Sequence, residues 1–189
     1  LKKLGVSHVL KRGYIHARSN GKLKGSKIRF KSISVGATQQ AILSSVISIG
    51  VSNLTNIAIE PEILELLKFL NSAGAKIKFS GKRSLKIEGV NYLNPTNFSI
   101  MGDRIEAGTF MCLACLNQGE LEIQNFDPKT VKKEIEYLKK TGAKIKIFDN
   151  KVFVKGSKKI KSINKLITQE APGFPTDIAP IFTVLMCMA

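Results

Sequence analysis

A repeat of about 68 residues constrains the fold of this chain more than any other feature. The segment GAKIKF at 74–79 returns as GAKIKI at 142–147. An amphipathic helical pattern precedes each copy, at 61–73 and at 129–141, and a degenerate third copy, LKKLGVSHVL, opens the chain. Apolar residues at helical spacing, then a glycine, then alternation predict a helix, a C′ glycine and a strand in that order.

The residues upstream of these segments match as well. Apolar helices that end at a glycine are predicted at 37–50 and 105–119, and a strand follows each of them. A further short strand follows each GAKIK strand, at 84–89 and at 151–156. One unit therefore reads strand, helix, strand, helix, strand, strand. We expect a mixed α/β (α+β) fold in which such βαβαββ subdomains pack around an axis.

The best candidate for a linker is NYLNPTNF at 91–98, which has no clear period. We predict that residues 1–97 are part of a first domain and residues 98–189 part of a second. The units within them occupy, in order, 1–17, about 26–90, about 97–156 and about 163–189. Because the first residue is Leu1 and the terminal apolar run IAPIFTVLMCMA has no capping signal, we expect a fragment cut at both ends.

The net charge of +16 is unevenly distributed, since the first 31 residues hold ten basic side chains and no acid. Such a field favours anionic partners: phosphorylated metabolites, nucleic acid or a membrane surface. A nucleic-acid-binding module is an alternative function, but only Tyr14 and Phe30 are aromatic among these basic residues, and no known motif is present. No run reaches the roughly 18–20 apolar residues of a membrane span. We expect neither nucleic acid nor a membrane as partner.

Cys112, Cys115 and Cys187 lie in apolar helical patterns. The first two have CxxC spacing, but no second Cys or His pair accompanies them, so we expect no metal site and reduced core thiols. The N-terminus also lacks the apolar core of a signal peptide. These features predict a cytoplasmic protein.

The first helix of each unit is predicted to begin at an equivalent place, at 32–38, 101–109 and 175–180. Candidate capping side chains are Ser34 or Thr38, Asp103, and Thr176 or Asp177. Symmetry would aim these helix starts at a shared region, where their unpaired N–H groups suit a phosphate or carboxylate. The basic strand KIRFK at 27–31 precedes the first start. The alternative is that these are ordinary caps beside an exposed basic strand.

Five segments occur in the order and spacing of a known family: SVGAT (34–38), EPEI (60–63), LNSAGAKI (70–77), DRIEAGTF (103–110) and FPTD (174–177). On these residues the chain resembles the UDP-N-acetylglucosamine 1-carboxyvinyltransferases, which are enolpyruvyl transferases, over nearly its whole length. DRIEAGTF and FPTD together are the specific part. The resemblance implies an inside-out α/β barrel (α/β prism) of two domains, each with three copies of the subdomain, and a crossing between domains near Met101.

The resemblance also implies a reaction: transfer of the enolpyruvyl group of phosphoenolpyruvate to the 3′-hydroxyl of UDP-N-acetylglucosamine, with release of phosphate. This addition–elimination is the first committed step of peptidoglycan precursor synthesis, and thus serves cell-wall biogenesis, cell shape and cell division. It uses no cofactor. The attacking hydroxyl must lose its proton, which a carboxylate within hydrogen-bond reach can accept. In the family this is the aspartate of FPTD, here Asp177, which follows Thr176.

Further site residues follow from the same resemblance. Those that align with contacts to the uridine diphosphate are Ser32, Ile33, Ser34 and Val35. Some family members have a lysine at the position of Ser32, where this chain has only the adjacent Lys31.

Acidic and basic residues near the predicted domain crossing are candidates for the wall of the cleft. For Asp103, Arg104 and Glu106 we expect a structural role there. Glu60 and Glu62 either touch the cleft or start a helix at the intervening proline.

The reactive loop cysteine of the family should lie upstream of Leu1, and its phosphoenolpyruvate-binding lysine and arginines also fall outside these residues. We therefore expect residues 1–189 to be inactive alone. Two alternatives remain: the sister enzyme 5-enolpyruvylshikimate-3-phosphate synthase, which fits DRIEAGTF and FPTD less well, and a folded remnant without activity. The sequence does not indicate the oligomeric state.

Overall fold

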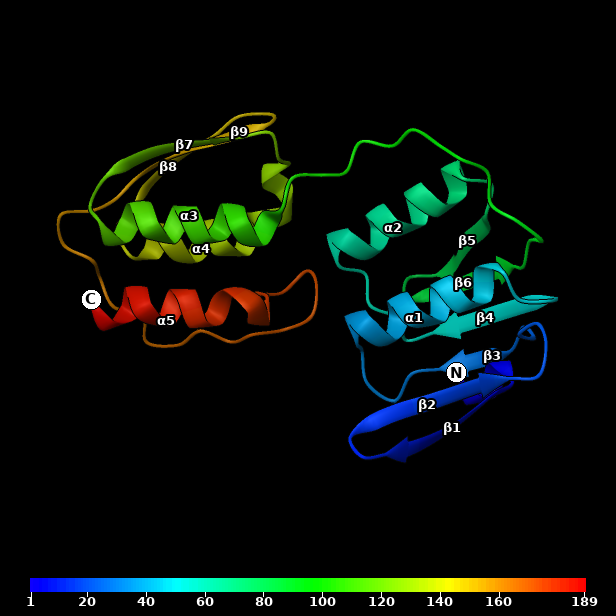
Figure 1. Ribbon diagram of the computed structural model, residues 1–189. Coiled ribbons are helices and arrows are strands. Elements are labelled where there is room, and N and C mark those ends of the chain that lie inside the picture. Colours follow the sequence, from blue (N-terminus) through cyan, green and yellow to red (C-terminus); the bar gives the residue numbers. More distant parts are fainter. The chain divides into compact units, whose positions relative to one another are not determined.

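The computed structural model describes residues 1–189, which form two compact units, Leu1–Ser99 and Ile100–Ala189 (Figure 1). Each unit has a hydrophobic core of its own. Ile42, Leu54 and Ile87 are fully buried in the first core, and Met111 and Leu138 in the second.

The first unit contains, in chain order, η1 (Lys2–Leu4), β1 (Val6–Lys11), β2 (Tyr14–Ser19), β3 (Lys27–Arg29), α1 (Val35–Val46), β4 (Val51–Thr55), α2 (Pro61–Ser72), β5 (Lys76–Gly81) and β6 (Ser84–Glu88). Four strands form a sheet in the order β3-β4-β6-β5, in which β3 runs parallel to β4 and the other pairs are antiparallel. Alternation along the strands places Leu54, Ile77 and Leu85 in the core, where α1 and α2 pack on them.

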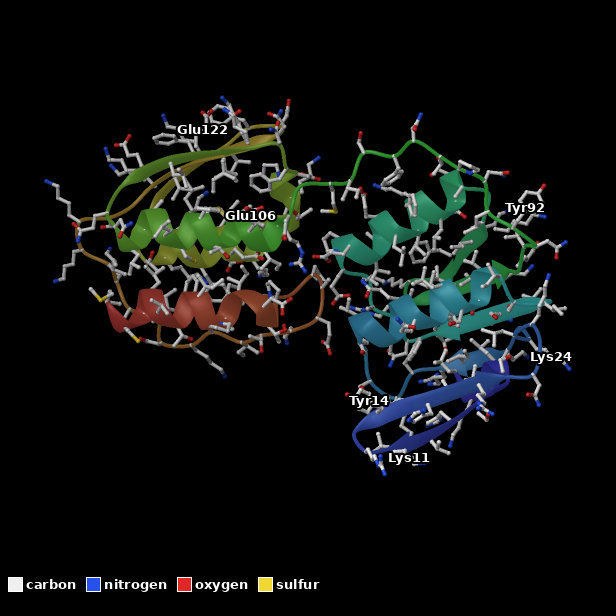
Figure 2. All side chains as sticks on the ribbon, viewed as in Figure 1. Lys11, Tyr14, Lys24, Tyr92, Glu106 and Glu122 are labelled. Atoms are coloured by element: carbon white, nitrogen blue, oxygen red, sulfur yellow. The ribbon has the colours of Figure 1, made fainter.

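The β1–β2 hairpin is a separate two-stranded sheet, and nearly all of its side chains are exposed. Lys11 and Tyr14 lie at its tip and point outward (Figure 2). It follows η1 and Gly5, so it has the same place after a helical turn and a glycine as the β5–β6 hairpin has after α2.

The second unit contains α3 (Arg104–Leu116), β7 (Glu120–Gln124), η2 (Pro128–Val131), α4 (Lys132–Lys140), β8 (Lys144–Ile147), β9 (Lys151–Lys155), η3 (Thr176–Ile178) and α5 (Ala179–Cys187). Its antiparallel sheet has the order β7-β9-β8. The sheet lies on one side of α3 and α4, and α5 packs on their other side (Figure 1). The helix α3 is therefore the central element of this unit.

The glycines that follow the repeated helices share one backbone conformation. Gly5, Gly74 and Gly142 have φ of 94°, 97° and 99°. A residue with a side chain pays roughly 1–2 kcal/mol in this left-handed region, so the glycine is required there. Asn56 and Asn125 also match, with φ of 61° and 64°. The mixed α/β fold and the helix–glycine–strand order are confirmed, although the first helix is only the short turn η1.

The prediction of a complete second unit was wrong at its first strand. No strand forms at the start of this unit: the chain between β6 and α3 has neither helix nor strand, and part of it is held against α2. Asn94 N–H donates to the Ala73 carbonyl at 2.8 Å, and Phe98 packs edge-to-face on Phe69 with ring centroids 5.4 Å apart. The single helix predicted at 129–141 was also wrong in part, since its first turn is the 3₁₀ helix η2.

Candidate functional site

The motif FPTD lies at the start of α5, in the second unit. Phe174 and Ile178 are buried, with 1% and 0% of their surfaces exposed. Thr176 and Asp177, which lie between them, are exposed. The motif therefore presents two polar side chains on a turn that is anchored on both sides.

The first anchor is aromatic. Phe174 packs edge-to-face against Tyr137 of α4 and Phe182 of α5, with ring centroids 5.3 and 5.6 Å away. Such pairs are each worth about 0.5–1.5 kcal/mol beyond the area that they bury. The Phe174 carbonyl also accepts a hydrogen bond from Gln169 N–H at 2.9 Å. The backbone just before Asp177 is thus fixed by both its side chain and its main chain.

The second anchor is Ile178, which directly follows Asp177. Its side chain packs against α3 at Gly108, within the motif DRIEAGTF. The two motifs that are most specific in the sequence are therefore in contact.

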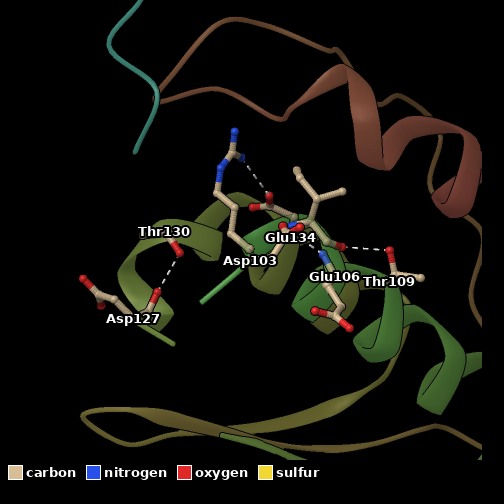
Figure 3. Close-up of polar contacts among 8 residues, drawn as sticks. Asp103, Glu106, Thr109, Asp127, Thr130 and Glu134 are labelled. Atoms are coloured by element: carbon tan, nitrogen blue, oxygen red, sulfur yellow. Dashed lines mark hydrogen bonds and ion pairs between the residues drawn. The ribbon is translucent and has the colours of Figure 1, made fainter. Parts of the chain in front are cut away.

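Two of the three predicted helix caps are confirmed. Ser34 Oγ accepts from Ala37 N–H at 3.3 Å at the start of α1. Asp103 Oδ1 accepts from the N–H groups of Ile105 and Glu106 at 2.7 and 3.2 Å at the start of α3 (Figure 3). The alternative cap Thr38 was wrong, since its buried hydroxyl accepts from Ala58 N–H at 3.0 Å.

The third cap was wrong for both candidates. No side chain caps η3 or α5, because η3 leads directly into α5 and the residue before α5 is the apolar Ile178. Asp177 therefore differs from its counterpart Asp103: its carboxylate is not engaged in capping and is accessible.

The segment Ser32–Val35 precedes and opens α1. Ser32, Ser34 and Val35 are exposed and Ile33 is half-buried. Exposed basic side chains lie just upstream, at Lys27, Arg29 and Lys31. The structure thus places three cations and a helix N-terminus along one short stretch, a combination that suits an anionic ligand.

Arg104 is buried, unlike its neighbours Asp103 and Glu106. Its Nη1 lies 3.7 Å from Glu134 Oε1 of α4, and the two side chains are 8% and 3% exposed. A dashed line in Figure 3 marks this ion pair at Glu134. Arg104 therefore joins α3 to α4 and is not directed to solvent.

Asp103 and Glu106 instead line a pocket of about 440 Å³ between α3 and β7. Phe110 and Glu122 also line it. Glu106 comes from α3 and Glu122 from β7 (Figure 2). In the first unit, Glu60 is 7% exposed and immediately precedes α2, while Glu62 is half-buried in its first turn. The helix begins at Pro61, as the sequence predicts.

The thiols of α3 are unreactive in this environment. Burial raises the pKa of Cys112 to about 12, with further contributions from Cys115 and Glu134, and raises the pKa of Cys115 to about 11. Cys187 is exposed near the end of α5, so the prediction of a buried thiol was wrong there.

No three His, Cys, Asp or Glu side chains gather closely enough to hold a metal ion. None of the helices has the length and apolarity needed to cross a bilayer.

Sequence reasoning missed Gly108, Ile178 and Tyr137, which support the exposed turn. Only the glycine carried a signal, because a glycine inside a helical pattern is costly and suggests close packing.

Comparisons with known proteins agree on one family. The model for EPSP synthase (3-phosphoshikimate 1-carboxyvinyltransferase) matches residues 1–189. The UDP-N-acetylglucosamine 1-carboxyvinyltransferase of Pelagibacter ubique is 46% identical over 189 residues, and that of Trichlorobacter lovleyi is 38% identical. All of this chain is covered in both cases, but it spans only 45% of the length of these relatives.

Two solved structures share the fold. The enolpyruvyl transferase NikO from Streptomyces tendae superposes with a TM-score of 0.82 at 19% identity, covering 100% of this chain and 47% of that one. EPSP synthase from Acinetobacter baumannii gives 0.62 at 19% identity, covering 86% and 39%. At this identity the likeness concerns the fold alone.

Proposed function

The chain belongs to the EPSP synthase family of carboxyvinyl (enolpyruvyl) transferases, and on this basis we propose that its protein acts on UDP-N-acetylglucosamine. It transfers the enolpyruvyl group of phosphoenolpyruvate to the 3′-hydroxyl of the sugar and releases phosphate. The choice of acceptor rests on the relatives of 46% and 38% identity, whose names specify this substrate. The product would feed peptidoglycan synthesis, with the consequences for cell shape and division that follow, and a cytoplasmic location suits both substrates.

Asp177 is the general base of this proposal. The observation that carries it is that Asp177 is exposed and caps no helix, although Ser34 and Asp103 cap at the two equivalent positions. A carboxylate on a firmly anchored turn can accept a hydrogen bond from a sugar hydroxyl and then its proton. Thr176 is exposed beside it and is the neighbouring contact to the sugar.

The diphosphate of the substrate would bind at the start of α1. Ser32, Ile33, Ser34 and Val35 form this segment, and the first N–H groups of α1 with the nearby Lys31 supply donors and positive charge. Asp103, Glu106, Glu60 and Glu62 are assigned to the wall of the substrate cleft, and Arg104 supports that wall through Glu134.

The architecture proposed for the whole protein is the inside-out α/β prism. Residues 1–97 would belong to its first domain and residues 98–189 to its second. The repeated order of elements and the TM-score of 0.82 to an enolpyruvyl transferase support this assignment.

The test uses the full-length protein, meaning the whole product of the gene that encodes residues 1–189. UDP-N-acetylglucosamine should raise its melting temperature, and shikimate 3-phosphate should not. Phosphate release should require both phosphoenolpyruvate and the nucleotide sugar. Turnover with shikimate 3-phosphate instead would show that the acceptor is that compound and not UDP-N-acetylglucosamine. The absence of turnover with either acceptor would contradict the proposed activity. Residues 1–189 alone should give no product.

A further inference from the structure

We propose that Gly108 is a positioning residue for Asp177. It leaves a notch in α3, which Ile178 fills, so the position of the neighbouring Asp177 depends on the absence of a side chain at 108. This inference rests on the proposed function, in which Asp177 takes the proton from the sugar hydroxyl.

Two distances show that α3 has no room for a side chain at 108 beside Ile178. A Cβ built on Gly108 would lie 2.8 Å from Ile178 Cδ1 and 3.5 Å from Ile178 Cγ1. Non-bonded carbon atoms pack best at roughly 3.5–4.0 Å, so a methyl group at 108 requires Ile178 Cδ1 to move by about 1 Å. Cδ1 is the far end of the isoleucine and turns about its second torsion angle, but Ile178 is fully buried, so the surrounding core limits how far it can turn aside.

The backbone of α3 does not itself require a glycine at 108. Gly108 is not among the residues with positive φ, and it lies in the interior of a 13-residue helix. A glycine in such a position is less stable than alanine by roughly 0.8–1.0 kcal/mol. The glycine therefore makes α3 less stable at this position. The contact with Ile178 explains why it is there, since only a glycine leaves room for that side chain.

The wall of the notch comes from the same motif and from α4. Glu134 Cγ would lie 4.0 Å from the built Cβ, and the Glu134 carboxylate pairs with Arg104. The motif DRIEAGTF thus supplies both the notch and one of the side chains that hold its wall. Because Ile178 is one residue from Asp177 within the three-residue η3, a displacement of Ile178 that its own side-chain torsions do not absorb moves the backbone next to Asp177.

The test is Gly108→Ala in the full-length protein. A misplacement of about 1 Å can cost as much as 10²-fold in rate, and we expect kcat to fall at least about tenfold while the Kd for UDP-N-acetylglucosamine changes less than about threefold. Ile178→Val removes Cδ1, the atom that meets the new methyl group. The double variant Gly108→Ala/Ile178→Val should therefore recover kcat to within about twofold of Ile178→Val alone. Gly119→Ala, which enters open space, is the matched control.

A kcat for Gly108→Ala equal to that of Gly119→Ala would overturn the inference, as would a loss that Ile178→Val does not rescue. If Gly108→Ala does not fold, Ile178→Ala tests the contact by removing the side chain that fills the notch; an unchanged kcat would overturn the inference. Asp177→Asn separates this result from the proposed function. If Asp177→Asn is inactive and Gly108→Ala is not impaired, only the positioning role fails; if Asp177→Asn keeps full kcat, the proposed base fails.

Discussion

Replacing Phe174 with alanine removes the aromatic anchor beside Asp177 and tests how the second unit is held together. Phe174 is 1% exposed and contacts both Tyr137 and Phe182 edge-to-face. Truncating a buried phenylalanine to alanine costs about 3–5 kcal/mol, which includes the lost ring contacts and the cavity that remains. Since about 1.4 kcal/mol is a factor of ten, the population of the open state should rise by roughly 140- to 3,700-fold.

Hydrogen exchange followed by mass spectrometry measures this change segment by segment. Peptides from α3 and α4 should exchange faster by that factor, and peptides from β4 and β6, which belong to the other core, provide the internal reference. Phe148→Ala is the matched control, because Phe148 is 48% exposed. If the two variants differ by less than about 1 kcal/mol in α3, the aromatic cluster does not support the turn and the reasoning fails.

Asp103→Ala should cost about 1–2 kcal/mol and speed exchange at the amides of Ile105 and Glu106, whereas Asp103→Asn, which still caps, should cost much less; equal losses would contradict the capping role. A thiol reagent at pH 8 should modify Cys187 in the folded chain and all three cysteines after denaturation, because the raised pKa of Cys112 and Cys115 keeps both protonated and both are buried; rapid modification of three thiols in the native state would contradict this. The pKa values of Cys112 and Cys115 in the folded chain, about 12 and 11, exceed the ordinary 9.0. As the pH rises, the unfolded chain therefore loses these two protons at a lower pH than the folded chain does. Their contribution to the free energy of unfolding should be fully present below pH 9 and be lost between pH 9 and about 12, which urea titrations at several pH values would measure.

The repeat allowed much of the fold to be predicted, because its signals are local. A φ near 95° after a helix requires a glycine, and the three copies of that glycine lie at equivalent positions in the repeat. The absence of a first strand in the unit that begins at about 97 could not be predicted, and neither could the contacts of Asn94 and Phe98 with α2, which no periodicity reveals. Tertiary packing decided the structure of that stretch.

In the candidate site, too, the local features could be predicted from the sequence and the tertiary contacts could not. The caps at Ser34 and Asp103 follow from residue type and position alone. The free carboxylate of Asp177 does not, because it depends on η3 replacing a normal helix start. The contact between Gly108 and Ile178 joins residues 70 positions apart and requires the packing of α5 on α3.

The central claim is that Asp177 takes a proton in the reaction, and the most direct measurement is kcat for Asp177→Asn in the full-length protein. Asp149→Asn, in the exposed turn between β8 and β9, is the control for the change of charge. We expect kcat of Asp177→Asn to fall by about 10²- to 10⁴-fold, the usual contribution of a general base, with the melting temperature unchanged. A kcat equal to that of Asp149→Asn would contradict the account.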